Sequence, residues 1–253
     1  MHGKFLFLGT GGSLGIPIVA CTCSVCSSSN PRNKRLRPSG VISVAGKHLL
    51  IDAGPDFRTQ ALRAHLKHLD GILLTHCHFD HIGGLDDLRV FSFAQKKKLP
   101  CLLSQESYDE LQIRYHYLMH PHSTDKFKFQ ILKSDFGRID FEGVDVQYMS
   151  YFQAGMKVSG YRIGTFAYVS DIREYSEEVV RALEGVETLV LSALRYTPTE
   201  VHFSLNEAVN FARSIKAKKT WLTHLAHDLE HDKVNQELPS DISLSYDGLE
   251  IEF

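Results

Sequence analysis

A short segment of the chain concentrates side chains that bind metal ions. It reads His76-Cys77-His78-Phe79-Asp80-His81 and directly follows the apolar stretch 71–75. On extended backbone, residues two positions apart point to the same side, so the imidazoles of His76 and His78 can bind one ion. We expect Asp80 and His81 to come from the following loop and to reach a neighbouring ion. Imidazole and carboxylate together suit Zn²⁺, Mn²⁺ or Fe²⁺.

Two later strand ends carry further candidate ligands. Asp171 follows the apolar stretch 166–170, and His224 follows the stretch 220–223 in the same way. A mainly apolar strand has no structural need for an acid at its end, so Asp171 is predicted to bridge two ions and His224 to complete the second ligand set. Plainer alternatives stay open: chance surface histidines for the first cluster, a helix N-cap for Asp171 and a hydrogen-bonded core histidine for His224.

The cysteines form a second group that could bind metal. Of five cysteines, Cys21, Cys23 and Cys26 crowd into six positions. This pattern is unlike a disulfide framework, and clustered cysteines in a reducing compartment more often hold metal. With a fourth ligand they fit tetrahedral zinc; free thiols in a mobile loop are the alternative. We interpret Cys77 as a small buried residue that points away from the neighbouring ligands, and Cys101 as a core residue.

Periodicity and turn residues predict the elements that position these side chains. We expect helices over 55–66, 85–93, 105–118, 177–183 and 204–215, the last with a capping box of Ser204 and Glu207. We expect single strands over 4–8, 71–75, 101–103, 127–132, 144–149, 188–192 and 220–223. Hairpins are expected to join 41–45 to 48–52, 161–163 to 166–170, and 242–245 to 249–253 across Asp247-Gly248. This order predicts sheets covered by helices on their outer faces.

Composition sets wider bounds on the protein. The 253 residues are 43% hydrophobic and 23% charged, with a formal net charge of −2, which is typical of a globular protein without a global basic field for nucleic acid. No signal peptide is recognisable, and no stretch approaches the roughly 18 to 20 apolar residues that span a bilayer. We therefore expect a cytoplasmic protein without a membrane partner. A homodimer is only the base-rate expectation.

Taken together, the motifs resemble the metallo-β-lactamase superfamily, and more closely its PhnP-like phosphodiesterase branch. The resemblance rests on the His-x-His-x-Asp-His run and its downstream Asp and His, and on three motifs of that branch: Gly9-Thr10-Gly11-Gly12, the Cys-x-Cys-x-x-Cys insertion and Ile51-Asp52-Ala53-Gly54. The ending Tyr246-Asp247-Gly248-Leu249-Glu250-Ile251 also fits. The resemblance implies an α/β fold, a four-layer αββα sandwich, as a single domain over 1–253 with a zinc-binding insertion at about 20–40. It also implies a dinuclear site at one edge, between the sheets.

The resemblance assigns roles to two more histidines. It implies that His227 completes a structural zinc site with Cys21, Cys23 and Cys26, which would tie the insertion to the loop after a catalytic ligand. It also implies a catalytic role for His202, as general acid or phosphate-orienting group, while Asp80 both binds metal and orients the attacking water. The alternatives are an exposed loop histidine for His227 and a loop or helix-cap histidine without a role for His202.

One departure from the family pattern concerns the first ion. The superfamily usually supplies a further histidine from the segment that here reads 151–157, where Gln153 is the nearest candidate ligand. A neutral amide oxygen is a weaker and harder ligand than imidazole. The first ion is therefore expected to bind loosely, to prefer Mn²⁺ to Zn²⁺, or to be lost on purification. Substitution by His116, His120 or His122 is the less favoured alternative.

The leading functional hypothesis is metal-dependent hydrolysis of a small or cyclic phosphodiester. A bound ion lowers the pKa of its water, and two ions can clamp a phosphoryl oxygen during in-line displacement. A tRNA 3′-processing type of RNA nuclease is the alternative, although the basic stretches 32–37 and 96–98 are short for gripping RNA. A non-catalytic metal-stabilised binding protein is a third hypothesis. Thioester or lactam hydrolysis stays open, because fold does not fix substrate.

Overall fold

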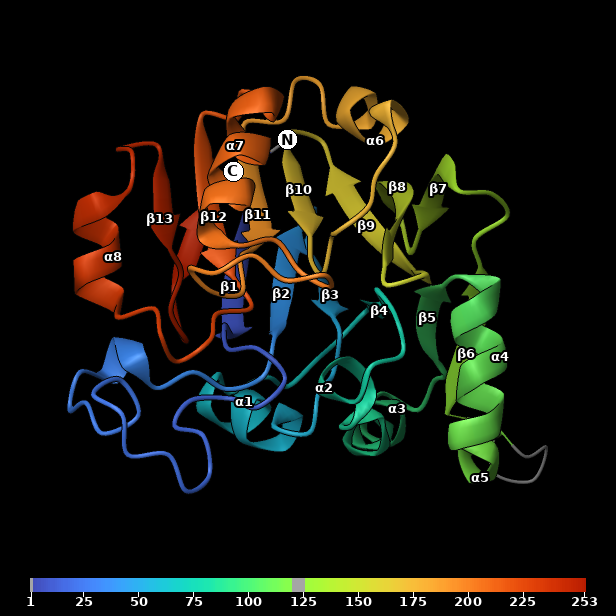
Figure 1. Ribbon diagram of the computed structural model, residues 1–253. Coiled ribbons are helices and arrows are strands. Elements are labelled where there is room, and N and C mark those ends of the chain that lie inside the picture. The colour runs from blue at the N-terminus through green and yellow to red at the C-terminus, as the bar shows by residue number, and fades with distance from the viewer. Residues whose placement is uncertain (1, 120–125) are drawn as a thin grey trace.

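The computed structural model describes residues 2–119 and 126–253 (Figure 1). His120 and His122 lie outside the described residues. Among the helices that are described, none is long and apolar enough to cross a membrane.

The first of two sheets has seven strands in the order β14-β1-β2-β3-β4-β5-β6. Its strands β14, β1, β2 and β3 pair antiparallel, and β3, β4, β5 and β6 then pair in parallel. The bounds are β1 Gly3–Gly9, β2 Ser39–Val44, β3 Lys47–Ile51, β4 Gly71–Leu73, β5 Leu99–Leu103, β6 Phe127–Ile131 and β14 Glu250–Glu252.

The second sheet repeats this plan, with the order β13-β12-β11-β10-β9-β8-β7. Its strands β7 to β10 pair antiparallel, and β10 to β13 pair in parallel. The bounds are β7 Phe136–Phe141, β8 Val144–Gln153, β9 Met156–Ile163, β10 Phe166–Val169, β11 Thr188–Ser192, β12 Lys219–Thr223 and β13 Ile242–Leu244. In consequence β8, β10 and β12 all run in one direction and end at the same edge.

Three apolar cores define the layers. One lies between the two sheets and includes Phe5 and Ile42 from the first sheet and Phe166 from the second. A second joins the outer face of the first sheet to α1 (Phe57–Arg63), α3 (Arg89–Gln95) and α4 (Gln105–Arg114). The third joins the second sheet to α6 (Glu177–Ala182) and α7 (Leu205–Ile215). Figure 1 shows α6 and α7 on the opposite side of the sheets from α1 and α3, so the predicted αββα sandwich is confirmed.

Most predicted elements are confirmed, with shifted ends. The capping box of α7 is present: Ser204 accepts from the Glu207 backbone, and the Glu207 side chain accepts from the Ser204 backbone. The helix predicted over 105–118 is divided into α4 and α5 (His116–Met119), and that predicted over 85–93 begins as the short helix η2 (Leu85–Leu88). Neither β7 nor α8 (His231–Glu237) was predicted. The predicted loop at 79–82 is one helical turn, α2 (Phe79–Ile82).

The predicted hairpin of 242–245 with 249–253 is wrong. Strand β13 pairs with β12 in the second sheet, whereas β14 pairs with β1 in the first. The turn residue Asp247 is buried between them and accepts hydrogen bonds from the backbone N–H and hydroxyl of Thr10, at 2.9 and 2.8 Å, and from the N–H of Leu36 at 2.9 Å. These long-range bonds fix the chain as it crosses from one sheet to the other, which no local turn pattern reveals.

Candidate active site

The candidate ligands all follow the C-terminal ends of strands. The segment 76–81 comes after β4, Asp171 after β10, and His224 directly after β12, while Gln153 is the last residue of β8. Buried hydrogen bonds join the two sheets at this edge: the Tyr161 hydroxyl of β9 donates to the Leu74 carbonyl at 2.6 Å, and the Ser159 N–H of β9 donates to the Thr75 carbonyl at 2.9 Å. The strand ends of both sheets are thereby held together.

The structure brings the first group of predicted ligands into contact. His76 Nε2 lies 3.1 Å from His78 Nδ1, as expected for side chains on the same side of extended backbone. Ligand atoms of His76, His81 and Asp171 also lie within 4.8 Å of one another. Cys77 between them is buried and its thiol donates to the Ser107 carbonyl instead, which confirms that it points away. Cys101 is buried within β5, as predicted.

A second group overlaps the first. His224 Nε2 lies 3.2 Å from Asp80 Oδ2 and 3.3 Å from Asp171 Oδ1. His81 Nε2 lies 3.4 Å from Asp80 Oδ2 and 3.3 Å from Asp171 Oδ2. The two oxygens of Asp171 therefore face different imidazoles, and Asp171 also lies within 4.8 Å of a ligand atom of His76, so it contacts residues of both groups. Asp171 is not a helix N-cap, because Ser176 occupies that position in α6.

The buried carboxylates of this cluster need cations nearby. Burial raises the pKa of Asp80, but His81 and the hydrogen bond to His224 outweigh it and hold that pKa well below its usual range. Burial lowers the pKa of His81, and the carboxylates of Asp171 and Asp80 reverse this and raise it well above its usual range. His81 Nε2 is buried without a hydrogen-bond partner although it faces two carboxylates. Buried anions need a paired cation, and these donors suit divalent metal ions.

The residues therefore fit two ions that share Asp171. One ion would be held by His76, His78 and Asp171, and the other by Asp80, His81, His224 and Asp171. Gln153 reaches the same cluster, but its amide nitrogen faces it, 3.3 Å from Asp171 Oδ1 and 3.0 Å from His202 Nε2. Its oxygen is buried without a partner. A half-turn of the amide would bring that oxygen to the position of the nitrogen, beside Asp171 and His202. His116 lies on an exposed part of α5 and does not line the site.

His202 lies beside the cluster on the loop before α7. Its Nδ1 is 3.3 Å from Asp171 Oδ1, and its backbone N–H and carbonyl both bond to the Thr199 hydroxyl at 3.0 Å. Burial lowers the pKa of His202 to about 4. A neutral imidazole still carries one N–H donor, and an anion bound next to it would raise its pKa.

Asp52 supports the cluster through a contact with the candidate ligand His81, a role that was not assigned from the sequence. Its Oδ2 lies 2.6 Å from His81 Nδ1 and accepts the Thr75 hydroxyl at 2.8 Å, while its Oδ1 accepts the Thr75 N–H at 2.8 Å. A carboxylate on the far nitrogen of a histidine fixes its tautomer and raises its basicity toward a metal. The signal was available, because Asp52 ends an apolar strand within Ile51-Asp52-Ala53-Gly54 just as Asp171 ends another.

Three of these residues have an unusual backbone. Asp52, Asp171 and His224 have φ values of 55°, 58° and 60°, in the left-handed region that L-residues seldom adopt. Each comes within two residues of a strand end, so the left-handed residue breaks the strand and turns its side chain into the site. Such strain persists where the surrounding structure holds it, and it gathers at functional sites.

The cluster opens into a cavity of about 600 Å³. It is lined by His78, Asp80, Asp171, His202 and His224, together with Ser13, Phe79, Gln153, Ala154, Met156 and Val201. A cavity of this size accommodates a nucleotide-sized molecule. Of the predicted ligands, His78, Asp80, Asp171 and His224 thus line the cavity together with His202, whereas His76 and His81 are fully buried.

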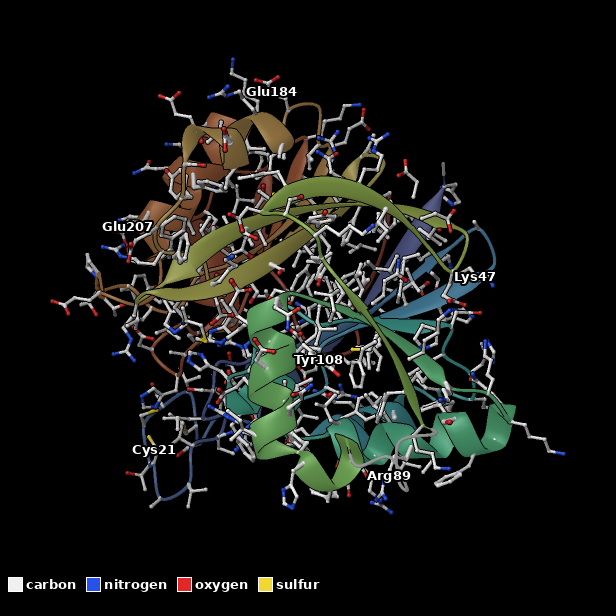
Figure 2. The ribbon with its side chains drawn as sticks, turned by 90° about the vertical axis from the view of Figure 1, so that its right-hand side faces the viewer. Cys21, Lys47, Arg89, Tyr108, Glu184 and Glu207 are labelled. Atoms are coloured by element: carbon white, nitrogen blue, oxygen red, sulfur yellow. The ribbon has the colours of Figure 1, made fainter. Side chains whose placement is uncertain are left out.

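The cysteine group forms a separate site on the insertion, whose first cysteine is labelled in Figure 2. His227 Nδ1 lies 3.3 Å from Cys21 Sγ and 3.5 Å from the Sγ atoms of Cys23 and Cys26. Four donors around one tetrahedral zinc ion stand roughly 3.5 Å apart, so the group fits such an ion with no open position. A hydrogen bond from the Cys26 N–H lowers the pKa of Cys23 to about 6, which favours the thiolate that binds metal.

Buried polar contacts tie the insertion to the loop that follows His224. The fully buried guanidinium of Arg35 donates to the carbonyls of Ala226 and Leu229, at 3.2 and 2.8 Å. The amide of Asn33 donates to Glu230 at 2.6 Å. These bonds and the Cys/His group stiffen the same loop, and they therefore support the position of His224.

The comparison with known proteins places the chain in a family. Residues 47–225 match the model of the beta-lactamase superfamily domain. The chain belongs to the metallo-β-lactamase superfamily. A solved structure described as a new diphosphatase from the PhnP family is 36% identical, with a TM-score of 0.94 over 100% of this chain and 98% of that one. The resemblance inferred from the motifs, including its PhnP-like branch, is confirmed.

Two further relatives show how widely this fold is used. Zinc-bound PqqB from Methylobacterium extorquens, 18% identical, superposes with a TM-score of 0.81 over 99% of both chains and shares the fold. An octanoyltransferase of Porphyromonas gingivalis is 36% identical over 98% of this chain but only 51% of its own length. This chain spans about half the length of that relative.

Replacement of Asp52 by Asn should weaken metal binding without unfolding the protein. The amide keeps the shape of the carboxylate but removes the charge behind His81, so we expect a loss of roughly 10- to 100-fold in metal affinity. Competition with a chelator, with bound metal counted by mass spectrometry, measures this. Asp145→Asn, which changes an exposed carboxylate on β8, serves as the control. An unchanged affinity in Asp52→Asn would show that Asp52 does not support the site.

Replacement of Cys23 by Ser should remove a single tightly held zinc ion and lower the melting temperature. A closed zinc site contributes directly to folding free energy, and serine is a poor substitute for thiolate. Native mass spectrometry and calorimetry measure both effects. Cys101→Ala removes a thiol remote from the group and should keep the full zinc content. Retention of all zinc by Cys23→Ser would contradict the assignment.

Proposed function

We propose that this chain is a metal-dependent phosphodiesterase that acts on small phosphodiesters, cyclic ones included. The observation that carries the proposal is Asp171, which lies within reach of candidate ligands of both groups and lines the cavity. Two-metal sites with a shared carboxylate suit in-line displacement at phosphorus, because both the attacking and the leaving oxygen need stabilisation. When bound, the ions supply Lewis-acid stabilisation of the phosphoryl group and a water of lowered pKa.

The residues of the chain position the reaction around that centre. Asp80 and Asp171 would hold the ions, and their oxygens would orient the attacking water. His202 stands at the cavity wall, where its N–H donates to a phosphoryl or leaving oxygen. The negative phosphate beside it raises its pKa and favours the protonated form that a departing alkoxide requires. Gln153 Nε2 lies between Asp171 and His202, and it keeps the imidazole turned toward the cluster.

The similarity to a PhnP-family diphosphatase fits the same chemistry. A disubstituted diphosphate presents at each phosphorus one organic ester and one bridging oxygen, so its shape and charge at the reacting atom are those of a diester. We therefore include diphosphate diesters in the proposed substrate class. The reaction in both cases is attack of water on phosphorus with departure of one bridging oxygen.

The first test is turnover of bis-4-nitrophenyl phosphate by protein of known metal content, with Mn²⁺ or Zn²⁺ added. We expect metal-dependent release of 4-nitrophenolate that is abolished in Asp80→Ala. Gln153→His should raise the affinity for the more weakly held ion, because imidazole is the better ligand for zinc. Absence of turnover with both sites loaded would overturn the proposal and favour a binding protein or a different substrate. Cleavage of a precursor tRNA with steep salt dependence would favour the nuclease instead.

His202→Ala should lose activity according to the leaving group. A 4-nitrophenolate departs without a proton, so kcat for its diesters should change little. A 2′,3′-cyclic nucleotide expels an alkoxide, and kcat should then fall roughly 100-fold or more. His48→Ala, which changes an exposed histidine on β3, should leave both reactions unchanged. An equal loss for both substrates would show that His202 acts in binding or structure and not as an acid.

A further inference from the structure

Phe79 has an exposed aromatic side chain, which packing in an apolar core does not explain. It is the first residue of α2, it lies between the candidate ligands His78 and Asp80, and 62% of its surface is accessible to solvent. It is also the one Phe, Tyr or Trp among the described residues that line the 600 Å³ cavity. Exposed apolar surface at the mouth of a polar site marks a contact with a ligand.

The ring of Phe79 lies against the backbone at Gly83. A Cβ atom at Gly83 would lie 2.9 Å from Phe79 Cε2 and 3.1 Å from Cζ, so the ring rests against a backbone position that carries no side chain. The absence of a side chain at Gly83 leaves room for this edge of the ring. The ring is therefore close to α2 at this edge, while most of its surface stays accessible to solvent for contact with a ligand.

The rest of the cavity wall is apolar or neutral apart from the metal cluster. Met156 and Val201 come from the start of β9 and from the loop before α7, and neither Lys nor Arg is found among the described residues that line the cavity. Phosphate groups beyond those at the metal centre would therefore meet no cation. The organic part of the substrate should be uncharged and partly flat.

We infer that Phe79 is a specificity-determining residue that stacks on a planar aromatic ring of the substrate, as in a nucleoside phosphodiester or nucleoside diphosphate diester. The phosphorus lies at the metal cluster, and the base lies on the open face of Phe79. Stacking on aromatic side chains tolerates every base, because each has a π-face, so the site selects nucleosides as a class. The inference deepens the proposed function, on which its kinetic test rests.

The test compares two diesters with the same leaving group. Thymidine 5′-(4-nitrophenyl) phosphate and methyl 4-nitrophenyl phosphate both release 4-nitrophenolate, so their chemistry is matched and only the retained group differs. In Phe79→Leu, kcat/KM for the thymidine ester should fall roughly 10-fold, mainly through KM, while the methyl ester stays within about 2-fold. Phe79→Tyr should retain the preference. Phe93→Leu, which alters another exposed phenylalanine, on α3 and outside the cavity lining, is the matched control.

The outcomes separate this inference from the proposed function. Equal losses for both esters, or none for either, would overturn the stacking role. Turnover of the methyl ester alone would keep the phosphodiesterase and reject the nucleoside preference. Should neither ester react, the phosphodiesterase proposal fails, and binding of thymidine 5′-monophosphate by saturation-transfer NMR decides the inference. Transfer to the base protons in the native protein that is lost in Phe79→Leu supports it, and absence of transfer to the base rejects it.

Discussion

Asp80 and Asp171 lie buried among imidazoles where the two sheets meet. The rest of the structure offsets the free-energy cost of burying these two carboxylates. Carboxylates without water need a cation nearby, and the donors here point inward, where divalent ions would satisfy them. No single segment could supply such a set. The strand ends of both sheets therefore meet at one edge, and hydrogen bonds from Tyr161 and Ser159 of β9 to the segment after β4 hold them together.

Residues that surround the metal cluster restrain the segments that carry the candidate ligands. Asp52 fixes His81 through a 2.6 Å contact, and the same carboxylate binds both polar groups of Thr75 just before the histidine run. The Cys/His group, Arg35 and Asn33 restrain the loop after His224. These contacts hold the left-handed backbone at Asp52 and His224, and at Asp171 the backbone N–H donates to the Ser192 hydroxyl at 2.8 Å. Precise placement of ligands matters because small displacements of reacting groups weaken catalysis strongly.

The substrate-facing side is built differently from the metal-facing side. It has an amide at Gln153 where the family usually has an imidazole, an exposed phenyl ring at Phe79, and no Lys or Arg among its described lining residues. We propose that these features adjust metal affinity and substrate choice without altering the scaffold. Relatives with the same fold carry such different names as diphosphatase and PqqB. This variety is expected where loops at strand ends carry the chemistry.

The local features follow from the amino-acid sequence. They are the strand that leads into the histidine run, the capping box of α7, the orientation of His76 and His78 to the same side of the backbone, and the family with its αββα layers. These depend on periodicity, spacing and motif, which are properties of neighbouring residues. Only long-range contacts place β13 and β14 in different sheets, set Asp52 against His81, and bring the Gln153 nitrogen to His202. Each of these depends on contacts between residues far apart in the chain, where buried hydrogen bonds and charge pairing override local preference.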